Sequence, residues 1–314
     1  MTPLKSWKVQ AVMANLNVSR AERLDMRVIA MYPDLTRSVA YKLIESEKVS
    51  VNGKIVTKAG TKLKPGDDIE VDYDHELMAD IPSIDIPVLY EDDDCVVILK
   101  PVGILSHSKG PFNPEATVAS WLAEHLVKAG KTPLWILEKD VESGSPNNPR
   151  AGIVHRLDRA TSGVMICAKT PAALAHLQKQ FSQRKTKKTY SAVVSGHLKP
   201  QHAIIDMPIE RNPKKPKTFH VSAGGKASVT EYQVMASNDK YDLVELKPVT
   251  GRTHQLRVHL HHQAHPIVGD TFYDGPKADR LYLHAHSLEI TLPNKERKTF
   301  TAPVPKEFNQ LIES

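Results

Sequence analysis

The sequence predicts an α+β protein in which a small helix-and-hairpin module precedes a larger domain built on a mainly antiparallel mixed sheet. Three observations support this prediction. Short strand-like apolar runs cluster after residue 87, few helical patterns separate them, and an Asn-Gly hairpin signal lies near the N-terminus. We expect the first module to span residues 16–74, a linker to span 75–86 and the larger domain to span 87–314.

The first module is predicted as a helix followed by a tight hairpin. Thr36 can cap a helix whose apolar positions share one face, with basic residues off that face. Asn52-Gly53 accepts positive φ at both turn positions, so the flanking segments should pair as a hairpin. Residues 64–67, Lys-Pro-Gly-Asp, form a second turn before another strand. The apolar positions of the helix are Val39, Leu43 and Ile44.

The larger domain is predicted from strand-like runs separated by Gly, Pro or Asp turns. One amphipathic helix is expected over residues 171–184, because apolar residues recur there at helical spacing. The linker prediction over 75–86 depends on acidic residues, Pro and isolated Ile without any period. The expected strands are 88–90, 95–99, 164–168, 190–194, 228–234 and 243–246.

Composition and charge restrict the class of protein. The formal net charge of +6 and the basic runs 184–188 and 211–217 favour a polyanionic partner, because Lys and Arg release counterions from phosphates. Each run, like the acidic run 91–94, can also be a solvated loop. Cys95 and Cys167 lie in apolar runs, which indicates buried hydrophobes rather than disulfides. Without a signal-peptide pattern or a stretch of about 18 apolar residues, we expect a cytoplasmic protein that does not contact membranes.

Common cofactor and nucleophile motifs are absent from the sequence. Neither a phosphate loop nor a Gly-rich dinucleotide turn is present, no Cys-x-x-Cys pair occurs, and the Ser hydrolase elbow is missing. Five histidines lie between residues 254 and 265, but no Cys and no nearby acidic residue completes a usual zinc ligand set. We therefore expect these histidines to contact phosphate or to pack, and we expect no metal.

The segment from His155 to Gly163 places a carboxylate between two cations. Asp158 stands between Arg156 and Arg159, directly before a turn and a predicted buried strand. Flanking cations keep an acid ionised, and an ionised, positioned carboxylate can attack an electrophilic carbon. A loop Asp beside an Arg is also a common structural feature. The segment alone leaves both interpretations open.

Four separated segments together resemble the RluA-type pseudouridine synthase family. They are residues 155–163 (HRLDRATSG), 100–103 (KPVG), 188–190 (KTY) and 251–259 (GRTHQLRVH). This resemblance extends from about residue 87 to the C-terminal region. The first module resembles the small RNA-binding domain named after ribosomal protein S-four, through residues 23–25 (RLD), the basic helix, 51–54 (VNGK) and 64–67 (KPGD). This arrangement is similar to that of the ribosomal large-subunit members, with residues 138–149 as an inserted surface loop.

The resemblance implies three catalytic residues: Asp158 as the catalytic aspartate, Tyr190 as the active-site aromatic residue and Arg257 as the ion-pair partner of Asp158. The reaction breaks the bond from ribose to uracil N1, turns the base and joins ribose to C5. A ring can stack on the detached uracil, whereas a phenol is a poor base unless its pKa is shifted. A planar guanidinium suits a bidentate contact. Residues 252–265 could form a strand or a helix. We favour a helix, because Thr253 can cap it, and Arg257 would then lie in its first turn.

RNA is the partner that the resemblance implies, and the first module favours large-subunit ribosomal RNA over transfer RNA. The target base must leave its stack, and the resemblance places Arg156 in the space that the base vacates. The isomerisation uses no redox partner and no group donor, so we expect no cofactor, and we expect a monomer. The other expected RNA contacts are Arg252, His254, Arg37, Lys42 and Lys54.

Other functions fit parts of the pattern. A non-catalytic RNA-binding or ribosome-assembly factor would keep the fold with a structural Asp158, but the presence of Asp158, Tyr190 and Arg257 together argues against it. A nucleoside glycosylase also uses a carboxylate at an anomeric carbon and would release free uracil. A pseudouridine synthase that modifies transfer RNA fits the catalytic residues as well.

Overall fold

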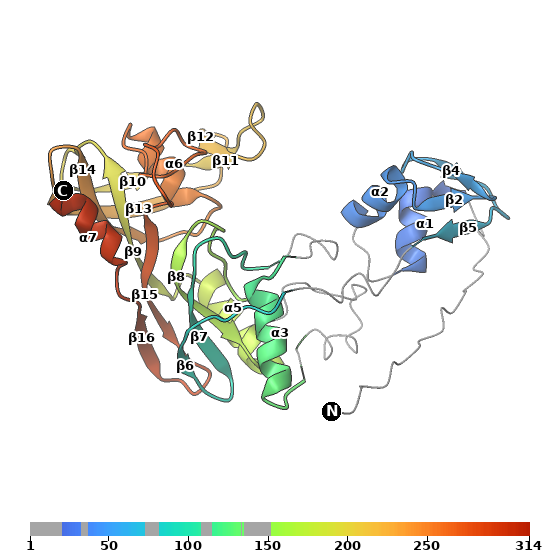
Figure 1. The fold of residues 1–314 in the computed structure, drawn as a ribbon, viewed down its shortest axis with the longest axis horizontal. Helices are drawn as coiled ribbons and strands as arrows, with labels where there is room; N and C mark the ends of the chain where they lie inside the picture. The colour runs from blue at the N-terminus through green and yellow to red at the C-terminus, as the bar shows by residue number, and fades with distance from the viewer. Residues whose placement is uncertain (1–20, 33–36, 73–81, 108–114, 133, 135–151) are drawn as a thin grey trace. The chain divides into compact units, whose positions relative to one another are not determined.

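The computed structural model describes residues 21–32, 37–72, 82–107, 115–132, 134 and 152–314. These residues form two compact units, one up to residue 72 and one from residue 82 onward (Figure 1). Within the described ranges, no helix is both long enough and apolar enough to cross a membrane. The predicted cap at Thr36, the first part of the predicted linker and the insertion at 138–149 lie outside the described residues.

The first unit packs two helices against short strands. Its core contains Leu24 and Val28 of one helix, Leu43 and Ile44 of the other, and Val49 from the sheet. The predicted hairpin is confirmed, because Asn52 and Gly53 have φ values of 52° and 72° and the flanking strands pair antiparallel. The elements are β1 (Glu22–Arg23), α1 (Leu24–Met31), α2 (Arg37–Glu45), β2 (Val49–Val51), β3 (Lys54–Ile55), β4 (Lys62–Leu63) and β5 (Ile69–Val71).

The second unit is built on a nine-stranded sheet with the order β10-β13-β14-β9-β15-β8-β7-β6, in which β16 also pairs with β15. Every pairing is antiparallel except that of β15 with β8, so the predicted mainly antiparallel α+β fold is confirmed. The strands are β6 (Val88–Glu91), β7 (Cys95–Lys100), β8 (Ser162–Ala168), β9 (Lys187–Ser195), β10 (His202–Asp206), β13 (Val229–Ser237), β14 (Tyr241–Pro248), β15 (Leu283–Thr291) and β16 (Arg297–Thr301).

Helices cover both faces of the β7–β8 part of the sheet. Along β7, Val96 and Ile98 pack in a cluster with α3 (Val118–Lys128), whereas Cys95 and Val97 pack in a cluster with α5 (Pro171–Ser182). This alternation follows from the two-residue period of a strand. Ile86, which lies in the predicted linker, is buried in the α3 cluster. The helix predicted over 171–184 is thus confirmed and ends two residues early.

The remaining helices belong to the other half of the sheet. Leu256 and Leu260 of α6 (Gln255–His262) and Phe308 of α7 (Lys306–Glu313) are buried in the core that contains β9 and β14. A separate two-stranded hairpin, β11 (Ile209–Arg211) with β12 (Phe219–Val221), projects beside α6 (Figure 1).

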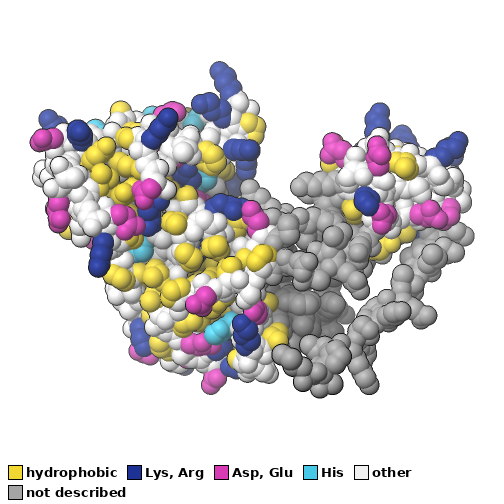
Figure 2. Space-filling view, in the orientation of Figure 1, with side chains coloured by type: hydrophobic (Ala, Val, Ile, Leu, Met, Phe, Trp, Pro, Cys, Tyr) yellow, Lys and Arg dark blue, Asp and Glu magenta, His cyan; other side chains and the backbone are white. Residues whose placement is uncertain are grey.

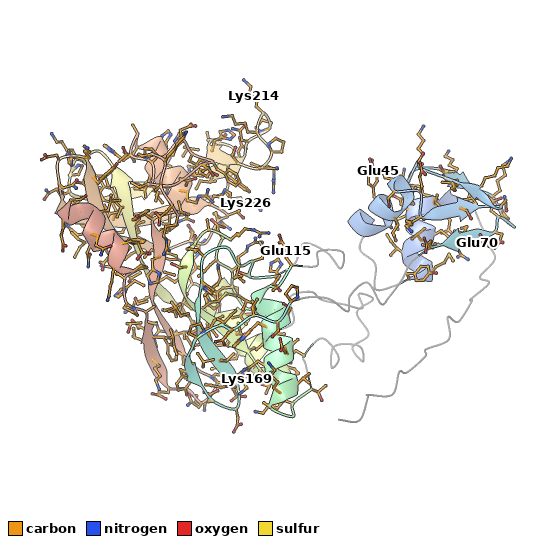
Figure 3. The ribbon with its side chains drawn as sticks, viewed as in Figure 1. Glu45, Glu70, Glu115, Lys169, Lys214 and Lys226 are labelled. Atoms are coloured by element: carbon orange, nitrogen blue, oxygen red, sulfur yellow. The ribbon has the colours of Figure 1, made fainter. Side chains whose placement is uncertain are left out.

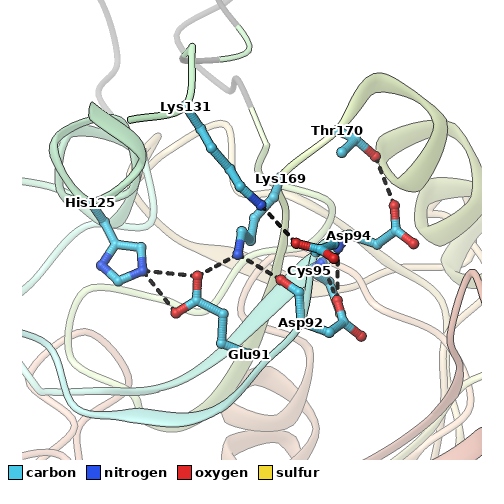
Figure 4. A network of polar contacts seen from close by, with 9 residues as sticks. Glu91, Asp92, Asp94, Cys95, His125, Lys131, Lys169 and Thr170 are labelled. Atoms are coloured by element: carbon cyan, nitrogen blue, oxygen red, sulfur yellow. Dashed lines mark hydrogen bonds and ion pairs between the residues drawn. The ribbon is translucent and has the colours of Figure 1, made fainter. Parts of the chain in front are cut away.

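The acidic run 91–94 is a clamped turn between β6 and β7 rather than a free charged face (Figure 4). Lys169, which is almost fully buried, donates to the carboxylate of Glu91 and to the carbonyl of Asp92. His125 of α3 contacts the same Glu91 carboxylate at 2.9 Å. The carboxylate of Asp92 accepts the backbone N–H groups of residues 94 and 95. This network ties α3 and the end of β8 to the turn.

Candidate active site

A cleft of the second unit brings together residues from four distant parts of the chain. It is lined by the loop before β8, by β9, by the segment between β14 and α6, and by Leu283 of β15. The predicted catalytic residues Asp158, Tyr190 and Arg257 all line it, as do three of the predicted RNA contacts, Arg156, Arg252 and His254.

Buried polar groups fix the loop that carries Asp158. The hydroxyl of Ser106 donates to the carbonyl of Leu157 at 2.9 Å and accepts the backbone N–H of the same residue at 3.1 Å. Lys100 is fully buried and donates to the carbonyls of Pro101 and Ile104, with the carbonyl of Arg159 at 3.4 Å. The 100–103 and 155–163 segments therefore support each other, and Asp158 is preorganised before any substrate binds.

His155 and Gly163 connect the same loop to the sheet. Burial lowers the pKa of His155 to about 3, which keeps the ring neutral and allows its Nε2 to accept the backbone N–H of Ile166 at 3.0 Å. Gly163 has a φ of 124°, and a Cβ there would lie 2.2 Å from the carbonyl oxygen of Ala285. Only glycine allows β15 to approach β8 this closely.

Arg257 is anchored by an acid that the sequence analysis missed. Its Nε and Nη2 atoms each donate to a carboxylate oxygen of Asp270 at 2.7 Å, and the side chain of Asp270 has no exposed area. Its Nη1 lies 3.5 Å from Oδ2 of Asp158. Burial opposes the charge, but the hydrogen bonds and charge of Asp270 raise the pKa of Arg257. Arg257 thus has two acidic neighbours, and the bidentate one is Asp270 rather than the predicted Asp158.

Aromatic rings surround this guanidinium. Its Cζ lies 5.1 Å from the ring centroid of Tyr273 and 5.3 Å from that of Phe272. The hydroxyl of Tyr273 contacts Nδ1 of His254 at 2.9 Å, and Nε2 of His254 lies 3.9 Å from Oδ2 of Asp158. Burial lowers the pKa of His254, an effect that Asp158 opposes. His254 thus contacts both the hydroxyl of Tyr273 and the carboxylate of Asp158.

The start of α6 differs from the prediction. The predicted helix is confirmed but spans Gln255–His262, and Thr253 does not cap it. The residue before the helix is His254, in the left-handed conformation with a φ of 57°. The buried side chain of Gln255 holds the turn instead: its Oε1 accepts from the hydroxyl of Thr250 at 2.6 Å and from the N–H of Arg252 at 3.0 Å. Gln255 is a second supporting residue that the sequence analysis did not assign.

Tyr190 lines the cleft from the middle of β9, opposite Ala285 and Leu246 in the neighbouring strands. Burial, and then the negative charge of Asp158, raise the pKa of its phenol. The shift runs against proton abstraction at neutral pH, because the phenol keeps its own proton. The ring face and the O–H donor are the groups that Tyr190 can offer.

The predicted cationic residues have different environments. Arg159 forms an ion pair with Glu115, whereas Arg156 is exposed in the cleft wall. Lys54 is exposed in β3 of the first unit. Arg37 and Lys42 belong to α2, but their side chains lie outside the described residues.

The cluster of histidines has no common centre. His259 is buried, with Nδ1 at 2.9 Å from the hydroxyl of Thr230 and Nε2 at 3.0 Å from the carbonyl of Met207. Nδ1 of His265 contacts the carbonyl of Ser195 at 2.8 Å. In the described part of the chain, no three His, Cys, Asp or Glu side chains are grouped so that they could hold a metal ion.

Comparison with known proteins gives two family matches. Residues 94–262 match the model described as RNA pseudouridylate synthase, and residues 22–69 match the S4 domain. Proteins named ribosomal large subunit pseudouridine synthase D, from Haemophilus ducreyi and from Escherichia coli strain K12, are each 34% identical to the chain over 311 residues. Each match covers 93% of this chain and 90% of the relative.

Solved structures also resemble this chain. A structure titled Human RNA Pseudouridylate Synthase Domain Containing 4 superposes with a TM-score of 0.55 at 27% identity, covering 72% of this chain and 92% of that one. Human RNA Pseudouridylate Synthase Domain Containing 1 gives the same TM-score at 24% identity, covering 74% of this chain and 96% of that one, and is evidence for the fold alone.

Proposed function

Because the chain belongs to the RNA pseudouridylate synthase family and is an isomerase acting on RNA, we propose that it converts uridine to pseudouridine in large-subunit ribosomal RNA with Asp158 as the nucleophile. The observation that carries the proposal is the placement of one carboxylate beside Arg257 and Tyr190 in a single cleft. The names of the similar bacterial proteins and the S4 match support the choice of RNA.

Each of five residues in or beside the cleft has a distinct part in the proposed reaction. Asp158 attacks C1′ and displaces N1 of the uracil, and the base then turns so that C5 bonds to C1′ as the bond to Asp158 breaks. C5 loses a proton and N1 gains one, so the product is an isomer of uridine. Arg257 orients the carboxylate, from which its Nη1 lies 3.5 Å, and Asp270 holds Arg257. Tyr190 stacks on the detached uracil, since its raised pKa makes it a donor rather than a base. Arg156, exposed at the cleft, fills the space that the flipped base leaves.

The hairpin β11–β12 supplies a candidate RNA-binding surface next to the cleft. Its loop carries exposed Lys214, Lys215 and Lys217, and Figure 3 shows Lys214 pointing away from the sheet. Dark-blue side chains gather at this projecting end in Figure 2. The hairpin base is joined to the cleft, because the backbone N–H of Phe219 donates to the hydroxyl of Tyr273 at 2.9 Å. Such exposed cations suit phosphate contacts.

The decisive experiment is a carbodiimide-based map of pseudouridine in cellular RNA, comparing a strain with the wild-type protein to one with Asp158→Asn. The substitution keeps the size of the side chain and removes its negative charge. We expect one or more large-subunit ribosomal sites to lose modification in the mutant. Unchanged modification would overturn the role of Asp158, and loss confined to transfer RNA would favour transfer RNA as the substrate.

The same protein preparations distinguish a synthase from a ribosome-assembly factor and from a glycosylase. A non-catalytic ribosome-assembly factor would show no Asp158-dependent site although it binds RNA. A nucleoside glycosylase would release free uracil from substrate RNA, which chromatography detects. Pseudouridine without free uracil excludes that class.

We also propose that the chain acts as a monomer with the domain limits 16–74 and 87–314 joined by 75–86. Light scattering on the purified protein measures this oligomeric state directly. Deleting the residues before about Asp80 should weaken RNA binding while the larger domain still folds, and loss of its folding would show that the two domains depend on each other.

A further inference from the structure

Three cations line the cleft without forming an ion pair to any described carboxylate: Arg156, Lys188 and Arg252. Arg159, in contrast, is neutralised by Glu115, and Arg257 by Asp270. Cations that remain unpaired in a cleft are free to bind an incoming anion. Of the three, Lys188 has so far been given no role.

Lys188 is held in an environment that disfavours an ammonium group. Burial, followed by the nearby charge of Arg184, lowers its pKa to about 8. Among the described residues, its Nζ has one acceptor, the carbonyl of Thr250 at 3.4 Å. An ammonium has three protons to donate, so this contact satisfies one of the three. Lys188 is half-buried, and withdrawing an ammonium from water even in part costs free energy unless a partner of opposite charge arrives.

The strand geometry places this ammonium on the substrate side of β9. Side chains alternate along a strand, so Lys188 and Tyr190 share the cleft face, about 6.8 Å apart along the strand. Lys187 points to the other face and pairs with Glu289 at 3.4 Å. Lys188 lies closer than Tyr190 to the exposed start of β9, one strand repeat from the ring on which the uracil would stack.

We propose that Lys188 binds a backbone phosphate of the RNA beside the target uridine. The inference rests on the proposed function and adds a contact to the RNA backbone rather than to the base. Within the described part of the chain, Lys188 lacks both an anionic partner and enough hydrogen-bond acceptors. A phosphate supplies both, since it carries negative charge and offers several acceptor oxygens. An uncharged base carbonyl would satisfy one donor and leave the charge unpaired.

The test is a double-mutant cycle between protein and RNA. The probe is a synthetic RNA stem-loop containing the mapped uridine, in which each neighbouring phosphate is replaced in turn by an uncharged methylphosphonate. Binding is measured in the Asp158→Asn background, so that no turnover occurs. Lys188→Met should weaken binding of the unmodified RNA about tenfold, the energy of one charged contact. At one position, the methylphosphonate should weaken RNA binding by the protein with Lys188 by a similar factor. The same replacement should not change RNA binding by Lys188→Met.

Matched variants separate this contact from a general effect of charge or folding. Lys187→Met removes the adjacent lysine from the opposite face and should change affinity by less than twofold. Lys188→Arg keeps a cation and should retain the dependence on that phosphate. An unfolding curve establishes that Lys188→Met is folded.

Two results would overturn the proposal. One is additive loss at every phosphate, with no position where methylphosphonate and Lys188→Met affect the same interaction. The other is a fall in kcat at unchanged KM for Lys188→Met in the Asp158 protein, which would place the ammonium on the reacting base. The cycle measures affinity alone and can use any large-subunit stem-loop that carries pseudouridine in the wild-type strain, whether or not Asp158→Asn abolishes that modification. Failure of the Asp158 mapping experiment and failure of the phosphate contact are therefore seen separately.

Discussion

Among the described residues, positive charge is paired with carboxylates in one part of the cleft and unpaired in another. We call the part around Asp158 and Arg257 the floor, and the part formed by Arg156, Lys188 and Arg252 the rim. On the floor, Arg257 is locked in a bidentate ion pair with Asp270 and lies 3.5 Å from Asp158. On the rim, Arg156, Lys188 and Arg252 have no described carboxylate partner. The floor cation is oriented before RNA arrives, as electrostatic catalysis requires. The rim cations are left for the partner to neutralise, as binding requires.

This contrast assigns different kinetic signatures to the two regions. Changes on the floor should lower kcat or stability, because they disturb a fixed geometry. Changes on the rim or on the hairpin β11–β12 should raise KM and reduce the salt dependence of binding. Variants in each region test whether the floor acts in catalysis and the rim in binding.

Asp270→Ala should have the largest effect, because it leaves a buried guanidinium without its bidentate partner. Breaking a buried ion pair costs about 3–5 kcal/mol of unfolding free energy, and turnover should fall by about 100-fold or more as Arg257 loses its orientation. Denaturant unfolding and single-turnover kinetics measure the two effects.

A second variant separates stability from catalysis at the same pair. Replacing both members, with Arg257→Leu and Asp270→Leu, removes the unpaired charge and should recover much of the stability. The double variant should stay inactive. If it regains activity, the floor is a structural pair and the division between floor and rim fails.

Arg257→Lys should lower kcat about 100-fold and leave KM nearly unchanged. Lysine keeps the charge, but a single ammonium cannot hold Asp270 through two parallel hydrogen bonds and also reach Asp158. Steady-state kinetics on the mapped RNA measure this split. A rise in KM without a fall in kcat would move Arg257 from the floor to the binding surface.

The sequence could predict much of the floor because its residues lie in segments with a recognisable order. Asp158, Tyr190 and Arg257 were expected together, and all three line one cleft. Asp270 was missed, because the fold of its turn is what brings it to Arg257. In that turn the N–H of Asp270 donates to the carbonyl of Ile267, and its carbonyl accepts the N–H of Gly275. A lone Gly-Asp pair after an apolar run gave the only local signal.

The order of the sheet depends on contacts that local patterns do not record. The six expected strands are present, but β15 enters late in the chain and lies between β9 and β8. Sequence reasoning assigned no strand to β10, β11, β12, β15 or β16. Thr253 was expected to cap α6 from local propensity alone, whereas the buried amide of Gln255 fixes that turn through Thr250 and the backbone of Val229. Contacts between distant parts of the chain thus determine both the strand order of the sheet and the start of α6.

Replacing the three hairpin lysines, Lys214, Lys215 and Lys217, by Ala should weaken RNA binding about tenfold and leave kcat unchanged. Each phosphate contact contributes about 0.7–0.9 to the slope of log K against log salt, so the slope should fall by about 2. Filter binding at several salt concentrations measures it. A control with the same charge change replaces Lys128, Lys240 and Lys306, which do not line the cleft, and an equal loss in the control would mean that only net charge matters.

The smallest effect should be a pH dependence of RNA affinity that comes from Lys188. Its pKa in the free protein is lowered to about 8, and a bound phosphate would raise it, so binding takes up a proton when the amine is neutral. The contribution of Lys188 is therefore complete below about pH 8 and declines as the pH rises above that value. Burial keeps His155 neutral over this range, so its ring adds no titration there. Affinity should fall several-fold between pH 7 and 9 for the protein with Lys188, and by less for Lys188→Met. Equal pH profiles would show that the rim cation remains unpaired in the complex, and the contrast between floor and rim would then rest on Arg156 and Arg252 alone.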